Sequence, residues 1–236
     1  MEKTVLLFIE SNTSGTGYLF LENALKNHMC PILFTANPEL YKIPYNGITI
    51  EKVNTNDINS ILDSCYNLYR NNIKISGVLS TSDYYVYTAS IIAKTLGLPG
   101  ASPFAIRDCR DKYVQRKLMQ QHGMPTPKYL YINNIEEFRQ LDKQIEFPVI
   151  IKPIDGSGSF GVSLCKTESE LIEKLEQILN RKYNERGLPV NSSALIEEYI
   201  DGDEYSVEMI GMQILGITKK YLGDLPYFVE INAQIL

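Results

Sequence analysis

The sequence predicts an α/β fold in two successive parts, a parallel sheet with helices on both faces and then an α+β region. Two observations support this prediction. In the first hundred residues, apolar runs typical of buried strands alternate with segments whose apolar residues recur at helical spacing. Beyond a cluster of Gly and Pro residues at 97–103, short strand patterns joined by turn residues become frequent and form an antiparallel tail.

The elements of the first part follow in strict alternation. The continuous apolar run 4–9 predicts a strand that is buried on both faces. Further strands are expected at 31–35, 48–53 and 76–80, and helices at 18–28, 56–69 and 84–96. Such repeated strand–helix units are typical of a parallel sheet.

The second part begins with a helix predicted over 108–122, which ends at a Gly-Met-Pro sequence. The helix expected after Thr167 starts with a capping box. A shorter helix is expected at 135–141, and strands at 128–132, 147–152, 162–165, 194–200, 204–210, 215–221 and 227–231.

Composition excludes several classes of function. The chain has 236 residues, 44% of them hydrophobic, and a net charge of -5, which fits a folded protein and disfavours nucleic-acid binding. No apolar run is long enough to span a membrane or to form a signal peptide, so we expect a cytoplasmic protein without a membrane partner. The four cysteines form no CxxC pair and there are two histidines, which disfavours zinc binding and a triad hydrolase.

The most informative segment is the glycine-rich stretch that follows Lys152. Gly156, Gly158 and Gly161 match a bare GxGxxG pattern, but the loop opens into a strand instead of the helix of a dinucleotide site. Kinase and Walker signatures are absent. A lysine at the end of a buried strand, followed by a Gly/Ser flap, suits phosphate binding. An ordinary glycine-rich hairpin with a surface lysine is the equally weighted alternative.

Two further segments carry candidate residues. Glu197 and Glu204 lie seven positions apart around an apolar Tyr-Ile pair, as a nucleoside pocket at a strand edge would require. A solvated acidic turn is the alternative. Lys112 lies near the start of a predicted helix and could reach a phosphate, or it could pair on the surface with Asp108.

Lys112, the strand ending at Lys152 with its flap, and the Glu197–Glu204 segment occur in an order that resembles the ATP-grasp superfamily of carboxylate–amine ligases, and its bacterial L-amino-acid ligase branch in particular. The resemblance implies a preceding domain at 1–100, a helical connection at 101–127, a small lid subdomain at 128–200 and the start of the large subdomain at 201–236. It also implies that the large subdomain is truncated.

The resemblance also assigns roles to individual residues. Two lysines would contact phosphates, the flap would cover the β- and γ-phosphates, and acidic residues with the strand backbone would hold adenosine. The implied ATP-binding residues are Lys112, Lys152, Ser157, Gly158, Ser159, Gly161, Glu197, Glu198, Tyr199, Ile200 and Glu204. In this scheme Glu197 approaches the adenine amine and Glu204 the ribose.

The implied activity is ATP-dependent ligation through an acyl phosphate, with ATP, Mg²⁺ and a small carboxylate, expected to be an amino acid. Glu230 and Asn232 are the candidate metal ligands, because alternate residues of a strand face the same side. They lie closer to Glu204 than the family pattern requires. An earlier strand of the same branch is therefore the preferred interpretation of 219–230, and catalytic residues stay unassigned.

Three functions follow from this sequence. The first is a ligase, with Thr13, Ser14, Gly15, Thr16 and Gly17 holding a substrate carboxylate at a helix N-terminus or forming a simple turn. The second is a nucleotide-binding module without catalysis. The third is an assembly partner whose site is completed by another chain, and an open sheet edge would favour a homodimer.

Overall fold

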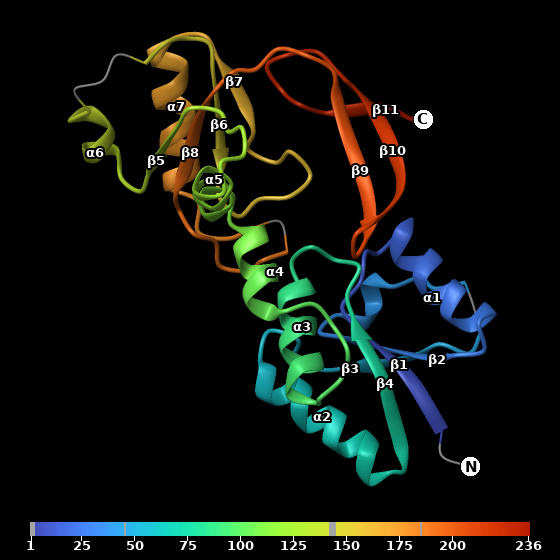
Figure 1. Cartoon of the computed structure of the whole chain (residues 1–236). Coiled ribbons are helices and arrows are strands. Elements are labelled where there is room, and N and C mark those ends of the chain that lie inside the picture. The colour runs from blue at the N-terminus through green and yellow to red at the C-terminus, as the bar shows by residue number, and fades with distance from the viewer. Residues whose placement is uncertain (1–2, 45, 142–144, 185) are drawn as a thin grey trace. The chain divides into compact units, whose positions relative to one another are not determined.

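The computed structural model of the chain describes residues 3–44, 46–141, 145–184 and 186–236 (Figure 1). It divides into two compact units, Met1–Asp108 and Cys109–Leu236. The first contains a parallel sheet and the second contains two antiparallel sheets, which confirms the predicted fold class. None of the described helices combines the length and the apolar character needed to cross a membrane.

The first unit is built on a four-stranded parallel sheet in the order β3-β2-β1-β4. Its strands are β1 Lys3–Ile9, β2 Cys30–Thr35, β3 Thr49–Lys52 and β4 Ile73–Leu79. In β1, Val5 and residues Leu7–Ile9 are buried, because helices cover both faces of the sheet.

Helix α1 (Thr16–Lys26) covers one face, where Leu21 and Ala24 pack on Phe8 and Leu33 (Figure 1). Helices α2 (Ile58–Arg70) and α3 (Val86–Thr95) lie together on the opposite face. Asp57 caps α2 by accepting a hydrogen bond from the amide of Asn59, as the sequence pattern predicts. A short 3-10 turn, η1 Pro38–Leu40, follows β2.

The second unit contains an antiparallel sheet in the order β5-β8-β6-β7. Its strands are β5 Tyr129–Ile132, β6 Val149–Pro153, β7 Ser163–Cys165 and β8 Ala194–Glu198. Helices α6 (Ile135–Arg139) and α7 (Glu168–Leu179) pack on one face of it, over a core that includes Ile151, Ile196, Leu171 and Leu175. The opposite face carries the polar side chains described below.

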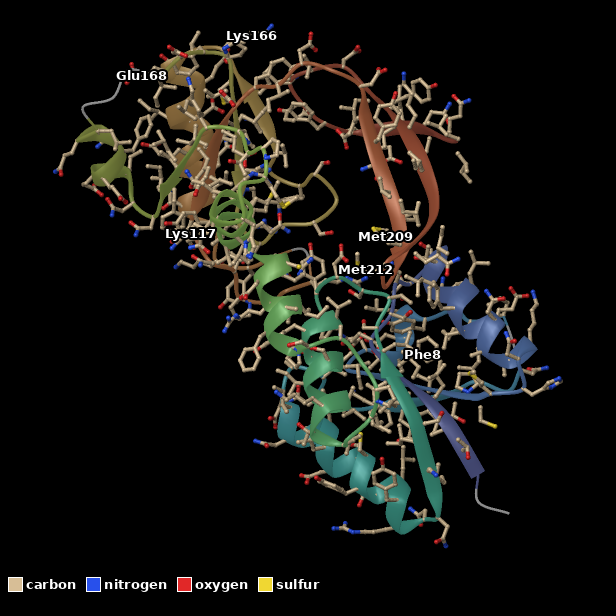
Figure 2. The ribbon with its side chains drawn as sticks, in the orientation of Figure 1. Phe8, Lys117, Lys166, Glu168, Met209 and Met212 are labelled. Atoms are coloured by element: carbon tan, nitrogen blue, oxygen red, sulfur yellow. The ribbon has the colours of Figure 1, made fainter. Side chains whose placement is uncertain are left out.

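A second antiparallel sheet, in the order β11-β10-β9, forms the C-terminal part of the same unit. Its strands are β9 Glu204–Ile210, β10 Gln213–Leu222 and β11 Glu230–Ile235. Met209 and Met212 mark the tight β9–β10 turn (Figure 2). The amide of Leu164 on β7 donates to the carbonyl of Pro226 at 3.0 Å, so a backbone hydrogen bond joins β7 to the loop before β11.

The prediction of one continuous helix over 108–122 is wrong. The structure has two helices in this region, α4 Pro103–Arg110 and α5 Lys112–Gln121. Asp111 separates them with an extended backbone, and its carboxylate accepts from the amide of Val114 at 3.0 Å. Aspartate is among the preferred N-cap residues, so it begins a new helix at this position.

The strand predicted over 227–231 is also displaced, since β11 begins at Glu230. The amide of Gly223 donates to the carbonyl of Val229 at 2.8 Å. This bond closes a loop that contains the apolar pair Tyr227 and Phe228, which the sequence pattern had assigned to a strand.

Candidate nucleotide site

A cavity of about 480 Å³ opens in the second unit, within the size range of small-ligand sites. Its walls come from α5, the end of β6, the flap, the end of β8 and the start of β9. Ten of the eleven residues expected to bind ATP line it: Lys112, Lys152, Ser157, Gly158, Ser159, Glu197, Glu198, Tyr199, Ile200 and Glu204. Arg116 and Phe228 line it as well.

The antiparallel register explains why Lys152 and Glu197 meet. Glu197 pairs with Ile150, and Lys152 pairs with Leu195, so these four side chains share one face of the sheet. Ile151 lies on the opposite face, within the core beneath α7. Strand alternation therefore directs the side chains of Lys152 and Glu197 toward α5, where the cavity opens.

Three charged side chains form a buried cluster on the cavity floor. The Glu197 carboxylate accepts from Nε of Arg116 at 2.6 Å and from Nη2 at 3.3 Å. It also accepts a short hydrogen bond from the ammonium of Lys152. Only 5% of the Glu197 side chain is exposed, compared with 13% for Lys152 and 18% for Arg116.

These contacts shift the pKa values of the cluster. Burial alone would raise the pKa of Glu197, but hydrogen bonds and charge from Arg116 and Lys152 hold it below the usual value. Burial lowers the pKa of Lys152 although Glu197 opposes the shift. Lys112 also lines the cavity, so three cations lie beside Glu197, while Glu198 and Glu204 add two further carboxylates to the lining.

Lys112 is attached to the base of the flap. Its amide donates to the carbonyl of Ile154 at 2.9 Å, and its ammonium donates to the carbonyl of Gly156 at 2.6 Å. Burial, together with the positive charges of Lys152 and Arg110, lowers the pKa of Lys112 to about 8. Its charge therefore changes in a pH range that is easily accessible to binding experiments.

We expect ATP binding to weaken as pH rises from about 7 to about 9, because Lys112 is protonated below its pKa of about 8 and loses its positive charge above it. The measurement is the dissociation constant for ATP across this range, by calorimetry. Lys112→Met should bind ATP more weakly at pH 7 and lose this part of the pH dependence. An identical pH profile in both proteins would contradict the assignment.

The flap spans residues 154–162 and connects β6 to β7, which pair antiparallel, so the predicted strand–loop–strand arrangement is present. Gly158, Ser159 and Gly161 all have positive φ, and Ser159 adopts this conformation despite its side chain. Gly161 is the one expected residue that does not line this cavity, and it lines another cavity on the flap together with Phe160 and Val162. Phe160 contacts the guanidinium of Arg181, 4.4 Å from its ring centroid.

Residues 197–200 and 204, which include three glutamates, line the cavity as well. The carboxylate of Glu198 accepts from the amide of Lys128 at 3.0 Å, and its own amide donates to the Lys128 carbonyl. Glu204 lies at the start of β9 and pairs with the ammonium of Lys220 at 3.2 Å. The structure thus brings Glu197, Glu198 and Glu204 to one cavity, with Glu197 already paired to two cations.

Glu230 and Asn232, the expected metal ligands, both bond to other groups of the protein. Lys220 also contacts Glu230 at 3.4 Å, so its ammonium lies between the carboxylates of Glu204 and Glu230. These carboxylates raise the pKa of Lys220 although burial acts in the opposite direction. The Asn232 side-chain oxygen accepts from the amide of Ala233. Glu230 is therefore ion-paired with a lysine, and Asn232 is bonded to the amide of the next residue. Their role as metal ligands stays a prediction from the sequence.

The segment expected to hold a substrate, Thr13–Gly17, belongs to the first unit. It leads into α1, and Thr16 accepts a side-chain hydrogen bond from Asn12 at 3.1 Å. Beside it, the buried Glu10 accepts hydrogen bonds from the hydroxyls of Thr35, Tyr41 and Thr55 and from the amide of Ala36. These bonds tie the carboxyl end of β1 to the segments that follow β2 and β3.

Arg116 and Phe228 are among the cavity residues that sequence reasoning did not find. Arg116 lies one helical turn after Lys112, so a search at i+4 from that lysine would have found it. Phe228 lies in the loop before β11, in a segment predicted to be a strand. No local pattern in the sequence distinguishes it from a core residue.

Residues 145–230 match the model of the ATP-grasp domain family. The uncharacterized protein y4rH of Sinorhizobium fredii is 30% identical over 230 residues, which cover 97% of this chain and 47% of the relative. D-alanine–D-alanine ligase A of Bacillus cereus is 28% identical over 146 residues, which cover 60% of this chain and 44% of that enzyme.

Solved structures share the fold. The L-amino acid ligase from Bacillus licheniformis superposes with a TM-score of 0.75 at 18% identity, covering 98% of this chain and 54% of that one. A D-alanine–D-alanine ligase from Bacillus anthracis in complex with ATP gives a TM-score of 0.61 at 18% identity, covering 98% and 70%. Residues 145–230 thus match an ATP-grasp domain, and the chain shares its fold with these solved ligases. It spans about half the length of the curated relatives it matches.

Proposed function

We propose that this chain binds ATP and acts in ATP-dependent carboxylate–amine ligation of the amino-acid ligase type. The observation that carries the proposal is the convergence of Lys112, Lys152, the flap and Glu204 on one cavity. The names of the relatives support it, since they include D-alanine–D-alanine ligases and an L-amino acid ligase. A cytoplasmic location and a homodimer stay predictions from the sequence.

The chemistry follows from the charges in the cavity. Lys112 and Lys152 would neutralise phosphate oxygens, and the flap would cover the β- and γ-phosphates with backbone N–H groups. An oxygen of the substrate carboxylate would then attack the γ-phosphorus while the bond to the β-phosphate oxygen breaks, which releases ADP. The amine would attack the resulting acyl phosphate, phosphate would leave, and the amine proton would pass to solvent.

The cluster of Arg116, Glu197 and Lys152 refines the expected role of Glu197. Its carboxylate already accepts three hydrogen bonds, so it is better suited to hold Lys152 than to bind the adenine amine alone. The backbone of Glu198–Ile200 then supplies the remaining groups for the ring edge. Mg²⁺ enters the proposal as the counter-ion that ATP carries, and Glu230 and Asn232 stay the candidates that the sequence predicts for holding it.

A nucleotide-binding module without catalysis is the second candidate, and the position of Lys220 between Glu204 and Glu230 favours it. Release of phosphate from MgATP, measured with a panel of amino acids and amines, separates the two functions. We expect ATP binding in calorimetry, and amino-acid-dependent phosphate release for a ligase. Binding without release with any amino acid would favour the module, and absence of ATP binding would overturn both.

A further inference from the structure

The contact between Arg116 and Glu197 is the best-defined polar interaction in the cavity. The guanidinium uses two neighbouring donors, Nε and Nη2, for the two oxygens of one carboxylate, at 2.6 and 3.3 Å. Such a fork fixes the orientation of both planar groups more strictly than a single ammonium contact can. The pair is largely buried, so solvent screens it weakly.

Lys152 depends on this orientation. Among the residues that the structure describes, Glu197 is the acceptor for its ammonium, which has three donors in total. One oxygen of Glu197 is shared between Lys152 and Nη2 of Arg116, while the other accepts from Nε. Without Arg116, the carboxylate would be free to rotate and to place both oxygens around the lysine.

We propose that Arg116 is a positioning residue of the nucleotide site: its guanidinium fixes Glu197 so that Lys152 keeps ammonium donors for a nucleotide phosphate. The inference rests on the proposed ATP site. The proposal gives different roles to two basic residues of the same cavity. Lys152 contacts the nucleotide, whereas Arg116 acts only through Glu197. Lys112, which is attached to Gly156, contributes its charge independently.

The test is a double-mutant cycle on the full chain, with the dissociation constant for ATP measured by calorimetry for wild type, Arg116→Met, Glu197→Gln and the double variant. We expect Arg116→Met to weaken binding about tenfold, the effect of losing a hydrogen bond to a charged group. In the Glu197→Gln background the same change should add less than about twofold, because its target carboxylate is already gone.

Arg116→Lys provides the conservative comparison. It keeps the charge but lacks the two-donor fork, so we expect it to restore only part of the affinity. If Arg116→Met does not fold, full wild-type affinity in Arg116→Lys overturns the role of the fork. Lys117→Met is the matched control, since it removes one positive charge from the exposed side of the same helix, next to Tyr113 (Figure 2). Its affinity should equal that of wild type.

Each outcome has a clear meaning. Equal weakening by Arg116→Met in both backgrounds would show that Arg116 acts directly on the ligand, and the positioning role would be wrong. Wild-type affinity in Arg116→Met would overturn it as well. A purely structural role predicts a lower unfolding temperature without ATP and an unchanged dissociation constant. If the wild-type chain itself fails to bind ATP, the proposed site is wrong and this inference falls with it.

Discussion

Lys152→Met is expected to raise the dissociation constant for ATP about 100-fold or more. The change removes the ammonium of a side chain that is only 13% exposed, where a charged hydrogen bond to phosphate contributes about 3 kcal/mol. Glu197 keeps its contact with Arg116, so no buried carboxylate is left without a cation. The variant should therefore fold, which circular dichroism and the unfolding temperature will verify.

Lys166→Met is the matched control for this prediction. Lys166 is an exposed lysine in the same unit, just before α7, and it lies outside the cavity (Figure 2). Lys166→Met changes the charge and the length of the side chain in the same way as Lys152→Met. We expect an unchanged dissociation constant for ATP, and a folded Lys152→Met with nearly wild-type affinity would show that this lysine does not contact the nucleotide.

Gly17→Ala should destabilise the first unit by about 3 kcal/mol or more. A Cβ atom at this position would lie 1.8 Å from the carbonyl oxygen of Asn12, so the backbone of the preceding loop would have to move. Alanine normally stabilises a helix by about 1 kcal/mol relative to glycine, but a backbone clash of this size outweighs that gain. Thermal unfolding should show a midpoint lowered by about 10 °C or more.

The control substitution for Gly17 is Gly100→Ala in the same unit. There the added Cβ would meet only the Cβ of Ala93, at an ordinary contact distance of 3.4 Å, and the backbone is not left-handed. We expect a change within about 1 kcal/mol. Equal midpoints for the two variants would mean that the loop at Asn12 adapts freely.

Sequence patterns located most helices and strands, because the buried residues of a helix or strand recur in the sequence at the spacing of that element. The strand over 204–210 coincides with β9, and the capping box at Thr167 begins α7 as predicted. Asp111 was misassigned because an aspartate inside a run of charged residues resembles a solvated helix face. The residues around Phe228 were misassigned because an apolar run has the same pattern in a strand and in a packed loop.

The site was predictable where residue type and spacing carry the chemistry. Lys152 and Glu197 followed from the strand ends that bear them. The helical spacing from Lys112 points to Arg116 as a neighbour of that lysine, but its pairing with Glu197 depends on the register of β6 against β8, which places Glu197 beneath α5. The ammonium of Lys220 between Glu204 and Glu230 depends on the pairing of three strands, which a linear sequence does not reveal.

The hydrogen bond from Leu164 to Pro226 has a consequence for the rate of flap motion. Strand β7 pairs with β6 along one edge and is bonded to the Pro226 loop along the other, so both ends of the flap start from fixed strands. We therefore expect movement to be confined to residues 154–162. Lid opening takes microseconds to seconds, more slowly than the motion of a free loop. We therefore expect opening of this one loop, and not a movement of the flanking strands, to set how fast a nucleotide enters.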